Sequence, residues 1–373
     1  MVSGLDAAAG ILVAIEPRHT RCTDPQLHRA GRPAHPPESV GCPWHTSSVD
    51  LGDERAFRSD IFHVLRQLVE ERGGSVTRAD LLEFQVGNYP IQLVDRNRGI
   101  RNPKDLASTL SIMSKPGSPY EDAVVGDSLF TYDYREGRID AGDNVKLRKS
   151  AETGLPLILL RWMKVGPDIR YLPIFPVYVV ADDPANRRVL LALDESLRVV
   201  GDPQHLTETE RRYVQRMTNQ RLHQPQFRSR VLMAYRNRCA VCRLGRPQLL
   251  EAAHIISDGK EHGIADIPNG LSLCKIHHAA YDRNLMGISR DYRVHIGPAL
   301  TEADNEGPIL KFGLKGMNNV RLTLPDKKSF YPEPDRLGER FDEFKNGDKG
   351  LRVGKDDFQR IDPVVVGPKL LTT

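Results

Sequence analysis

Residues 239–282 read CAVCRLGRPQLLEAAHIISDGKEHGIADIPNGLSLCKIHHAAYD, and the cysteines and histidines of this segment decide the fold around them. Cys239 and Cys242 form a C-x-x-C pair, and Cys274 and His277 form a C-x-x-H pair beyond an intervening loop. Two tight pairs of sulfur and nitrogen donors suit tetrahedral zinc, so the spacing predicts a structural zinc site. The alternative is a reduced pair of core cysteines, since a disulfide is not expected in a cytoplasmic protein.

Zinc leaves three polar residues of the segment unexplained, namely His254, Asn269 and His278. Together with the two ligand pairs, they make the segment resemble the HNH nucleases. In that family a ββα-metal fold puts a histidine at the end of a first strand, an asparagine in the following loop and a histidine on a helix. The resemblance implies a zinc-stabilised nuclease domain of this fold.

The chemistry of phosphodiester cleavage fits these residue types. It needs a base to activate water, a cation to neutralise charge on the phosphate, and rigid placement of both. His254 lies in the apolar stretch LLEAAHII and is the candidate base, because an imidazole titrates near neutral pH. His278 and Asp282 are four residues apart, so a helix would project both toward one divalent cation, Mg²⁺ or Mn²⁺. By resemblance, Asn269 orients the loop and the base.

One residue departs from the family pattern. Many HNH enzymes carry Asp or His as a metal ligand immediately before the base, and this chain carries Ala253. Asp282 is the candidate to replace that ligand. Without it, His278, phosphate and water would hold the cation, and affinity for Mg²⁺ should be weak.

Length and composition favour a cytoplasmic protein with two domains. The chain has 373 residues, of which 39% are hydrophobic, and a formal net charge of +4. No stretch is long and apolar enough to span a membrane. The opening apolar run LDAAAGILVAI has no basic segment before it, so a secretory signal is not expected.

Basic residues gather directly before the first cysteine pair. The stretch 211–238 contains eight arginines and neither Asp nor Glu. We expect this surface to neutralise DNA phosphates, the alternative being an ordinary solvated helix face. The candidate backbone contacts are Arg211, Arg212, Arg216, Arg221, Arg228 and Arg230.

Changes of pattern along the chain divide it into six parts. The division predicts a disordered leader (1–52), a small helical preface (53–88), a sheet-rich domain (89–200), a helical basic linker (201–236), the nuclease domain (237–345) and a flexible tail (346–373). In the linker we expect a helix capped by Thr207, a break at Pro225 and a second helix. Two strands are expected after Asp282, followed by a last amphipathic helix containing Leu337, Phe341 and Phe344.

The sheet-rich part contains short runs such as IQLV, SLFTYDY, PLILLRWM, YLPIFPVYVV and RRVLLAL, separated by Gly, Pro and Asp turns. They predict a curled, barrel-like sheet, so the chain as a whole is of the α+β class. Two segments, PYEDAVVGDSLFTYDY and DNVKLRKSAETGLPLILLRW, resemble the SRA (SET and RING-associated, or YDG) domain, a curled sheet of the PUA type. Ala123 and Asp133 depart from that family's commoner residues.

SRA domains extrude a modified cytosine from duplex DNA into a pocket. An extruded base needs aromatic faces for its lost stacking and polar groups for its Watson–Crick edge. By match to the motif, Tyr120 and Tyr132 are the stacking candidates. Asp122 and Asp133 are the hydrogen-bonding candidates, since a carboxylate accepts from the cytosine N4 amine. The alternative is that these tyrosines are ordinary sheet aromatics and the acids cap turns.

The first functional hypothesis is a modification-dependent, type IV-like HNH restriction endonuclease. Its substrate would be double-stranded DNA carrying 5-methylcytosine or a related modification. A double-strand break would then require two protomers or two encounters, which suggests a homodimer. The alternatives are an inert zinc-stabilised reader of modified DNA, and an HNH nuclease acting on unmodified or phosphorothioate DNA.

Overall fold

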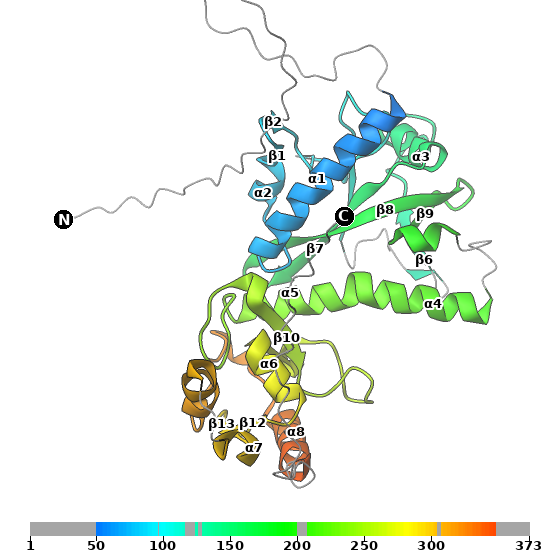
Figure 1. Cartoon of the computed structure of the whole chain (residues 1–373). Helices are drawn as coiled ribbons and strands as arrows, with labels where there is room; N and C mark the ends of the chain where they lie inside the picture. Colours follow the sequence, from blue (N-terminus) through cyan, green and yellow to red (C-terminus); the bar gives the residue numbers. More distant parts are fainter. Residues whose placement is uncertain are drawn as a thin grey trace, which may run out of the picture. The chain divides into compact units, whose positions relative to one another are not determined.

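The computed structural model describes residues 50–347, except residues 96, 116–123, 126–128, 200–206 and 304–306 (Figure 1). Nearly all of the predicted leader and tail therefore lies outside the described residues. The chain divides into two compact units, Met1–Ser229 and Arg230–Thr373, and the boundary falls inside the predicted linker.

The first unit combines helices with one curled sheet. Its elements are α1 (Leu51–Glu71), α2 (Arg78–Leu82), β1 (Gln85–Val86), β2 (Tyr89–Pro90), β3 (Ile100–Arg101), β4 (Ser111–Ser114), β5 (Val124–Val125), β6 (Leu129–Asp133), α3 (Asp143–Thr153), β7 (Leu157–Val165), β8 (Asp168–Asp183), β9 (Arg188–Ala192), η1 (Glu195–Val199), α4 (Glu208–Thr218), the π turn η2 (Asn219–His223) and α5 (Gln224–Ala234), which runs into the second unit.

The sheet has seven strands in the order β3-β4-β7-β8-β9-β6-β5. All neighbours are antiparallel except β4 and β7, which are parallel. The long strand β8 pairs first with β7 and then with β9, and the register shifts once along each pairing, at Leu157/Leu159 and at Val179/Ala181. Such bulges bend and twist a strand. The sheet is therefore a curled half-barrel, which confirms the predicted architecture at this level.

The helices of the predicted preface share a core with this sheet. Phe57, Ile61 and Leu65 follow one another at helical spacing on α1, and all three are buried. They belong to the same hydrophobic cluster as Ile158 and Leu160 of β7. The preface is thus packed onto the sheet rather than standing apart from it.

A buried ion pair fixes α1 to the loops beside the sheet. The Arg58 guanidinium lies 2.6 Å from the Glu54 carboxylate, and both side chains are fully buried. Arg58 Nη1 also donates to the carbonyl of Thr109 at 2.9 Å, while Glu54 Oε2 accepts from the backbone N–H of Ala107 at 2.7 Å. Glu54 and Arg58 therefore provide hydrogen-bond partners for backbone groups of Ala107 and Thr109 that would otherwise be buried without them.

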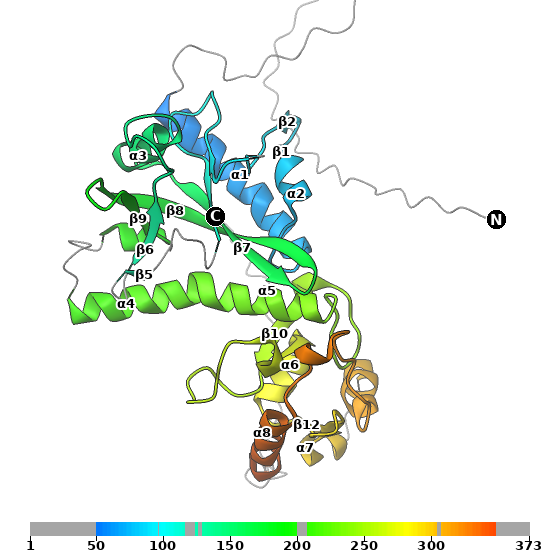
Figure 2. The same cartoon turned by 180° about the vertical axis from the view of Figure 1, so that it is seen from behind.

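Two predictions for this unit are wrong. The run IQLV, at 91–94, forms no strand; Ile91, Leu93 and Val94 are buried in an irregular segment instead. The helix does not break at Pro225 either, and Figures 1 and 2 show α4 and α5 as one continuous rod. The π turn η2 ends on a bond from Gln224 N–H to the Asn219 carbonyl, and this widened turn accommodates the proline, which has no N–H to donate.

The helix α4 begins as expected. Thr207 caps it, and the Glu210 side chain accepts the Thr207 N–H in return, so the two residues form a capping box. Val214 of α4 packs with Tyr178 and Leu190 of the sheet. The first part of the predicted linker is therefore an integral part of the first unit.

The second unit is built around a ββα motif. Its elements are η3 (Pro247–Leu249), β10 (Leu250–His254), η4 (Ile267–Asn269), β11 (Gly270–Cys274), α6 (Lys275–Asp282), β12 (Met286–Ile288), β13 (Val294–Ile296), α7 (Pro298–Thr301), the π turn η5 (Ile309–Leu314), η6 (Lys315–Met317), η7 (Lys328–Phe330) and α8 (Pro334–Gly347).

The pairing register of β10 and β11 determines which residues of the ββα motif lie opposite one another. β10 and β11 are antiparallel, with Leu250 opposite Cys274 and His254 opposite Gly270, and α6 begins directly after β11. The second strand expected after Asp282, at the end of 307–325, does not form: η5 and η6 occupy 309–317, and beyond them Arg321 makes only an isolated bridge to Arg293. None of the described helices is both long and apolar enough to cross a membrane.

We expect Glu54→Gln to destabilise the first unit by about 3–5 kcal/mol, because the substitution leaves the Arg58 charge buried without its counter-ion. Chemical denaturation followed by the fluorescence of Trp162, on β7, measures this loss. The control is Arg72→Ala, which removes an arginine that is 53% exposed in its ion pair with Asp80, and it should cost less than about 1 kcal/mol. Equal losses for the two variants would contradict the assigned role of the buried pair.

Candidate active site

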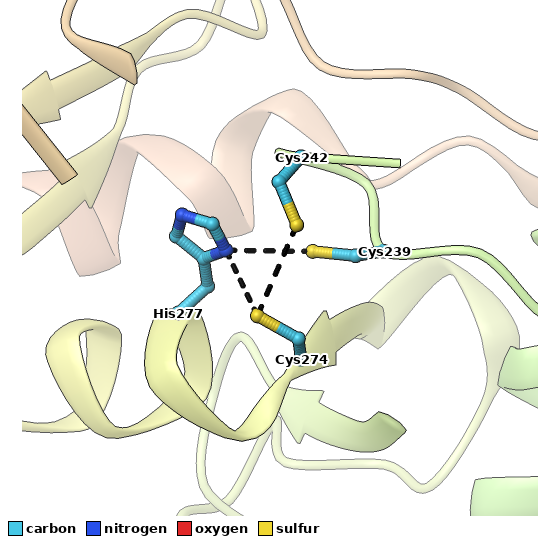
Figure 3. A group of neighbouring side chains, drawn as sticks. All are labelled: Cys239, Cys242, Cys274 and His277. Atoms are coloured by element: carbon cyan, nitrogen blue, oxygen red, sulfur yellow. Dashed lines mark hydrogen bonds between the residues drawn. The ribbon is translucent and has the colours of Figure 1, made fainter. Parts of the chain in front are cut away.

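The four predicted zinc ligands come together in the second unit (Figure 3). Cys239 and Cys242 lie in the turn before β10, Cys274 is the last residue of β11, and His277 lies in the first turn of α6. Their ligand atoms all lie within 4.8 Å of one another. Within the described residues, this is the one group of three or more such side chains that is close enough to share an ion.

The donor set fits zinc in both chemistry and spacing. The Cys242 and Cys274 sulfurs are 3.9 Å apart, and His277 Nδ1 is 3.6 Å from the Cys239 sulfur. Two thiolates bound tetrahedrally at about 2.3 Å are about 3.8 Å apart. His277 Nε2 lies 2.8 Å from the Gly313 carbonyl, so that nitrogen donates and Nδ1 is free to face the ion.

Asn269 holds the end of the first strand against the loop that follows it. Its side chain is fully buried. Oδ1 accepts from Ile256 N–H, and Nδ2 donates to the carbonyls of Ile256 and Ile264, each at 2.9 Å. The Asn269 carbonyl accepts from Ile255 N–H at 2.9 Å. The amide therefore fixes the backbone directly after His254.

His254 is the last residue of β10 and is partly buried. Burial lowers the pKa of His254 below the ordinary histidine value; the Asp258 and Asp282 carboxylates act in the opposite direction, and His278 acts with burial. At neutral pH the imidazole is therefore mostly uncharged, which is the form that can accept a proton.

His278 stands between two carboxylates. Its Nε2 lies 3.3 Å from Asp282 Oδ2, one helical turn further along α6, and its Nδ1 lies 2.6 Å from Glu251 Oε2 on β10. Two neighbouring ligands of an octahedral Mg²⁺ at about 2.1 Å are about 3.0 Å apart, so the first separation suits a shared cation. The contact between His278 Nδ1 and Glu251 matches a common arrangement, in which a histidine that binds metal through one nitrogen donates its other N–H to a carboxylate.

Glu251 is a residue that the sequence analysis did not single out. It lies on the same strand as Ala253, and side chains two residues apart on a strand point to the same face. Ala253 is fully buried and supplies no ligand atom. In the sequence, Glu251 is marked only by its place two residues before Ala253, and its contact with His278 becomes evident only once α6 is packed on β10.

The sequence comparison agrees with this geometry. Residues 239–289 match the sequence model of the HNH endonuclease family. The chain carries an HNH endonuclease domain. A solved structure described as "Modification dependent TagI restriction endonuclease" is also similar, over 65% of this chain and 84% of that chain, with 19% sequence identity and a TM-score of 0.26. No curated protein gave a match.

Outside the HNH domain, two of the four predicted base-pocket residues are described. Tyr132 and Asp133, at the end of β6, line a cavity of about 300 Å³ in the first unit. Tyr132 Oη lies 3.3 Å from the Gly99 carbonyl and is buried. Burial raises the pKa of Asp133, and the nearby Arg188 opposes that shift. Tyr120 and Asp122 lie outside the described residues.

The six candidate backbone arginines have different surroundings. Arg221 is paired with the largely buried carboxylate of Asp194, and Arg212 pairs with Glu208 one turn away on α4.

The other four candidate arginines differ in exposure. Arg211 and Arg216 are exposed on α4. Arg228 extends toward Gly74, and Arg230 is half-buried. Arg211 and Arg216 are therefore the two best placed to meet an external phosphate.

We expect the purified chain to contain one zinc ion, and Cys239→Ser to lose it, because three donors bind zinc far more weakly than four. Loss of the ion should also lower the thermal stability of the HNH domain. Elemental analysis and circular dichroism melting measure the two effects. Cys42→Ser, outside the cluster, is the control and should keep full zinc content. A Cys239→Ser protein with undiminished zinc would rule out this ligand set.

Proposed function

We propose that this chain is an HNH endodeoxyribonuclease that uses a divalent cation to cut double-stranded DNA carrying a modified cytosine. The observation that carries the nuclease assignment is the arrangement of His254, His278 and Asp282 on one ββα motif. The predicted zinc ligands lie in the same motif and directly before it. The family match over residues 239–289 supports the same reaction class.

In the proposed reaction, neutral His254 accepts a proton from the water that attacks the scissile phosphate. The lowered pKa of His254 supports this role, because the base stays uncharged at neutral pH. Asn269 holds the backbone after His254 in place during the attack. By resemblance to the family, the P–O3′ bond breaks, and the products are a 5′ phosphate and a 3′ hydroxyl.

His278 and Asp282 would hold the divalent cation, with water and a phosphate oxygen completing its coordination. When bound, the cation neutralises charge on the phosphate and on the departing oxygen. Glu251 would accept the N–H of His278 Nδ1, which leaves the lone pair of Nε2 on the side of Asp282. With Ala253 in place of a ligand, two protein donors remain, so we expect affinity for Mg²⁺ to be low.

The proposed specificity depends on the cavity of about 300 Å³ beside Tyr132 and Asp133. It is large enough to be a ligand site, and it is lined by an aromatic ring and a carboxylate. In the proposal an extruded cytosine enters it, and the Asp133 carboxylate accepts from the N4 amine. The SRA-like motif around β6 and α3 supports this reading, with 5-methylcytosine as the first candidate base.

A second candidate function is suggested by Ala253. Because this buried alanine contributes no donor, the chain could be an inert reader that binds modified DNA without cutting it.

In the nuclease proposal, each active site cuts one strand, so two protomers would cut the two strands. We therefore propose that the nuclease acts as a homodimer on DNA.

The test compares two plasmids, one unmodified and one carrying 5-methylcytosine, each incubated with the chain in Mg²⁺ or Mn²⁺. We expect the modified plasmid to be cut and His254→Ala to reduce the rate by at least about 100-fold, since general-base catalysis contributes about that much or more. His262→Ala, an exposed histidine of the same unit, is the control and should cut normally.

The outcomes separate the candidates. Binding of the modified plasmid without cleavage of either would establish the inert reader. Equal cleavage of both plasmids would overturn the dependence on modification and favour a nuclease for unmodified DNA. A phosphorothioate plasmid, cut in preference to both, would indicate the sulfur-modified backbone as the substrate.

We further expect Glu251→Ala to weaken Mn²⁺ binding by about 10-fold or more, because removing the carboxylate that orients a metal-binding histidine has that order of effect. Glu251→Gln keeps an oxygen that can accept the Nδ1–H, so its loss should be smaller. Electron paramagnetic resonance of free Mn²⁺, titrated with the chain in the absence of DNA, measures the affinity. Glu261→Ala, an exposed acidic residue of the same unit, is the control, and unchanged affinity in Glu251→Ala would contradict the assignment.

A further inference from the structure

Two arginines from different segments line the cavity of about 300 Å³ and share one carboxylate. Arg98 Nη1 lies 3.2 Å from Asp143 Oδ1, and Arg135 Nη1 lies 2.6 Å from Asp143 Oδ2. The Asp143 side chain is 7% exposed, whereas the two arginine side chains are 52% and 53% exposed. A buried acid at the start of α3 thus holds the guanidinium groups of two residues that line the cavity.

The backbone of each arginine is fixed as well. Asp95 Oδ1 accepts the N–H of Arg98 at 3.1 Å and that of Asn97 at 2.9 Å. The buried side chain of Asn144 accepts the N–H of Arg135 through Oδ1 and donates to its carbonyl through Nδ2, both at 3.0 Å. Because backbone and side chain are both held, little freedom remains to be lost when a ligand binds.

Charge and hydrogen-bonding capacity point to an anion. Two guanidinium groups and one carboxylate leave one net positive charge, and each guanidinium has five N–H donors, most of which Asp143 does not use. Lys115, Asp133 and Glu136 also line the cavity, so the case for an anion rests on the two guanidinium groups that Asp143 holds in place and not on the net charge of the whole lining. A fixed pair of this kind selects an anion by direct contact, and forked guanidinium groups match phosphate oxygens.

We propose that Arg98 and Arg135 clamp the phosphodiester group adjacent to the extruded nucleotide, with Asp143 as the residue that positions both. A nucleotide that rotates out of the duplex brings its own phosphates to the mouth of the pocket, where an anion clamp can retain it. The inference rests on the proposed function of this cavity. It adds a second recognition element, which reads the extruded backbone in addition to the base.

The experiment measures binding of the full chain, without added divalent cation, to four duplexes. They carry cytosine or 5-methylcytosine, each with a normal phosphate or an uncharged methylphosphonate next to that base. We expect methylphosphonate to weaken binding of the wild type to methylated DNA by about 10-fold. The Arg98→Ala/Arg135→Ala variant should bind the normal methylated duplex about 10-fold more weakly and lose its sensitivity to methylphosphonate. The slope of log affinity against log salt should fall by about 1 per arginine.

Arg138→Ala is the matched control. Arg138 lies three residues after Arg135, is 80% exposed and pairs with Asp140, but does not line the cavity. This variant should bind like the wild type and keep its sensitivity to methylphosphonate. Thermal melting of the double variant confirms that it is folded.

Each result decides one claim. If the double variant keeps the full sensitivity to methylphosphonate, the clamp is wrong, while the preference for methylated DNA still supports the base pocket. If the wild type does not distinguish methylated from unmethylated DNA, base extrusion fails, and the clamp fails with it. Weaker binding of the double variant to all four duplexes alike would reassign the arginines to general attraction of DNA.

Discussion

The HNH domain depends on one constraint. Four metal-binding side chains, from two segments that are far apart in the sequence, must come together at one point. Cys239 and Cys242 precede the ββα motif, whereas Cys274 and His277 lie at the junction of its second strand and its helix. Adjacent residues of a helix point about 100° apart. Once His277 is turned toward the cluster, His278 must face elsewhere, and it meets Asp282 and Glu251. The Cys239/Cys242/Cys274/His277 cluster thereby sets the rotation of α6.

The sequence was most informative where chemistry requires a fixed spacing. The spacing within each cysteine or histidine pair, and the four-residue interval from His278 to Asp282, depend on local geometry alone, so these contacts could be predicted. The meeting of the two ligand pairs could be predicted because zinc needs four donors. Glu251 could not be singled out in the same way, because an acidic residue on a half-exposed strand is usually a solvated side chain. Its contact with His278 depends on how α6 packs on β10, which is a tertiary property.

The failures in the secondary-structure prediction have a similar cause. The run at 91–94 is apolar because its side chains fill the core under α1, and burial alone does not make a strand. Pro225 predicts a break only if the preceding turn is an α turn, and here a π turn precedes it. The buried pair Glu54–Arg58 shows the converse case, because two charged residues on α1 would ordinarily predict an exposed face. Long-range partners decide the first and third outcomes, and the local π turn decides the second.

The π turn at Asn219–His223 alters the phase of the long basic helix. A turn of this kind amounts to one residue inserted into an α-helix, so everything after it is rotated by about 100° relative to an uninterrupted helical wheel. A helical wheel that starts at Arg216 and assumes a regular α-helix would therefore place Arg228 on the wrong side of the helix. The distribution of positive charge around this rod is set by a single inserted residue, and a one-residue deletion at this point would redistribute it without changing composition.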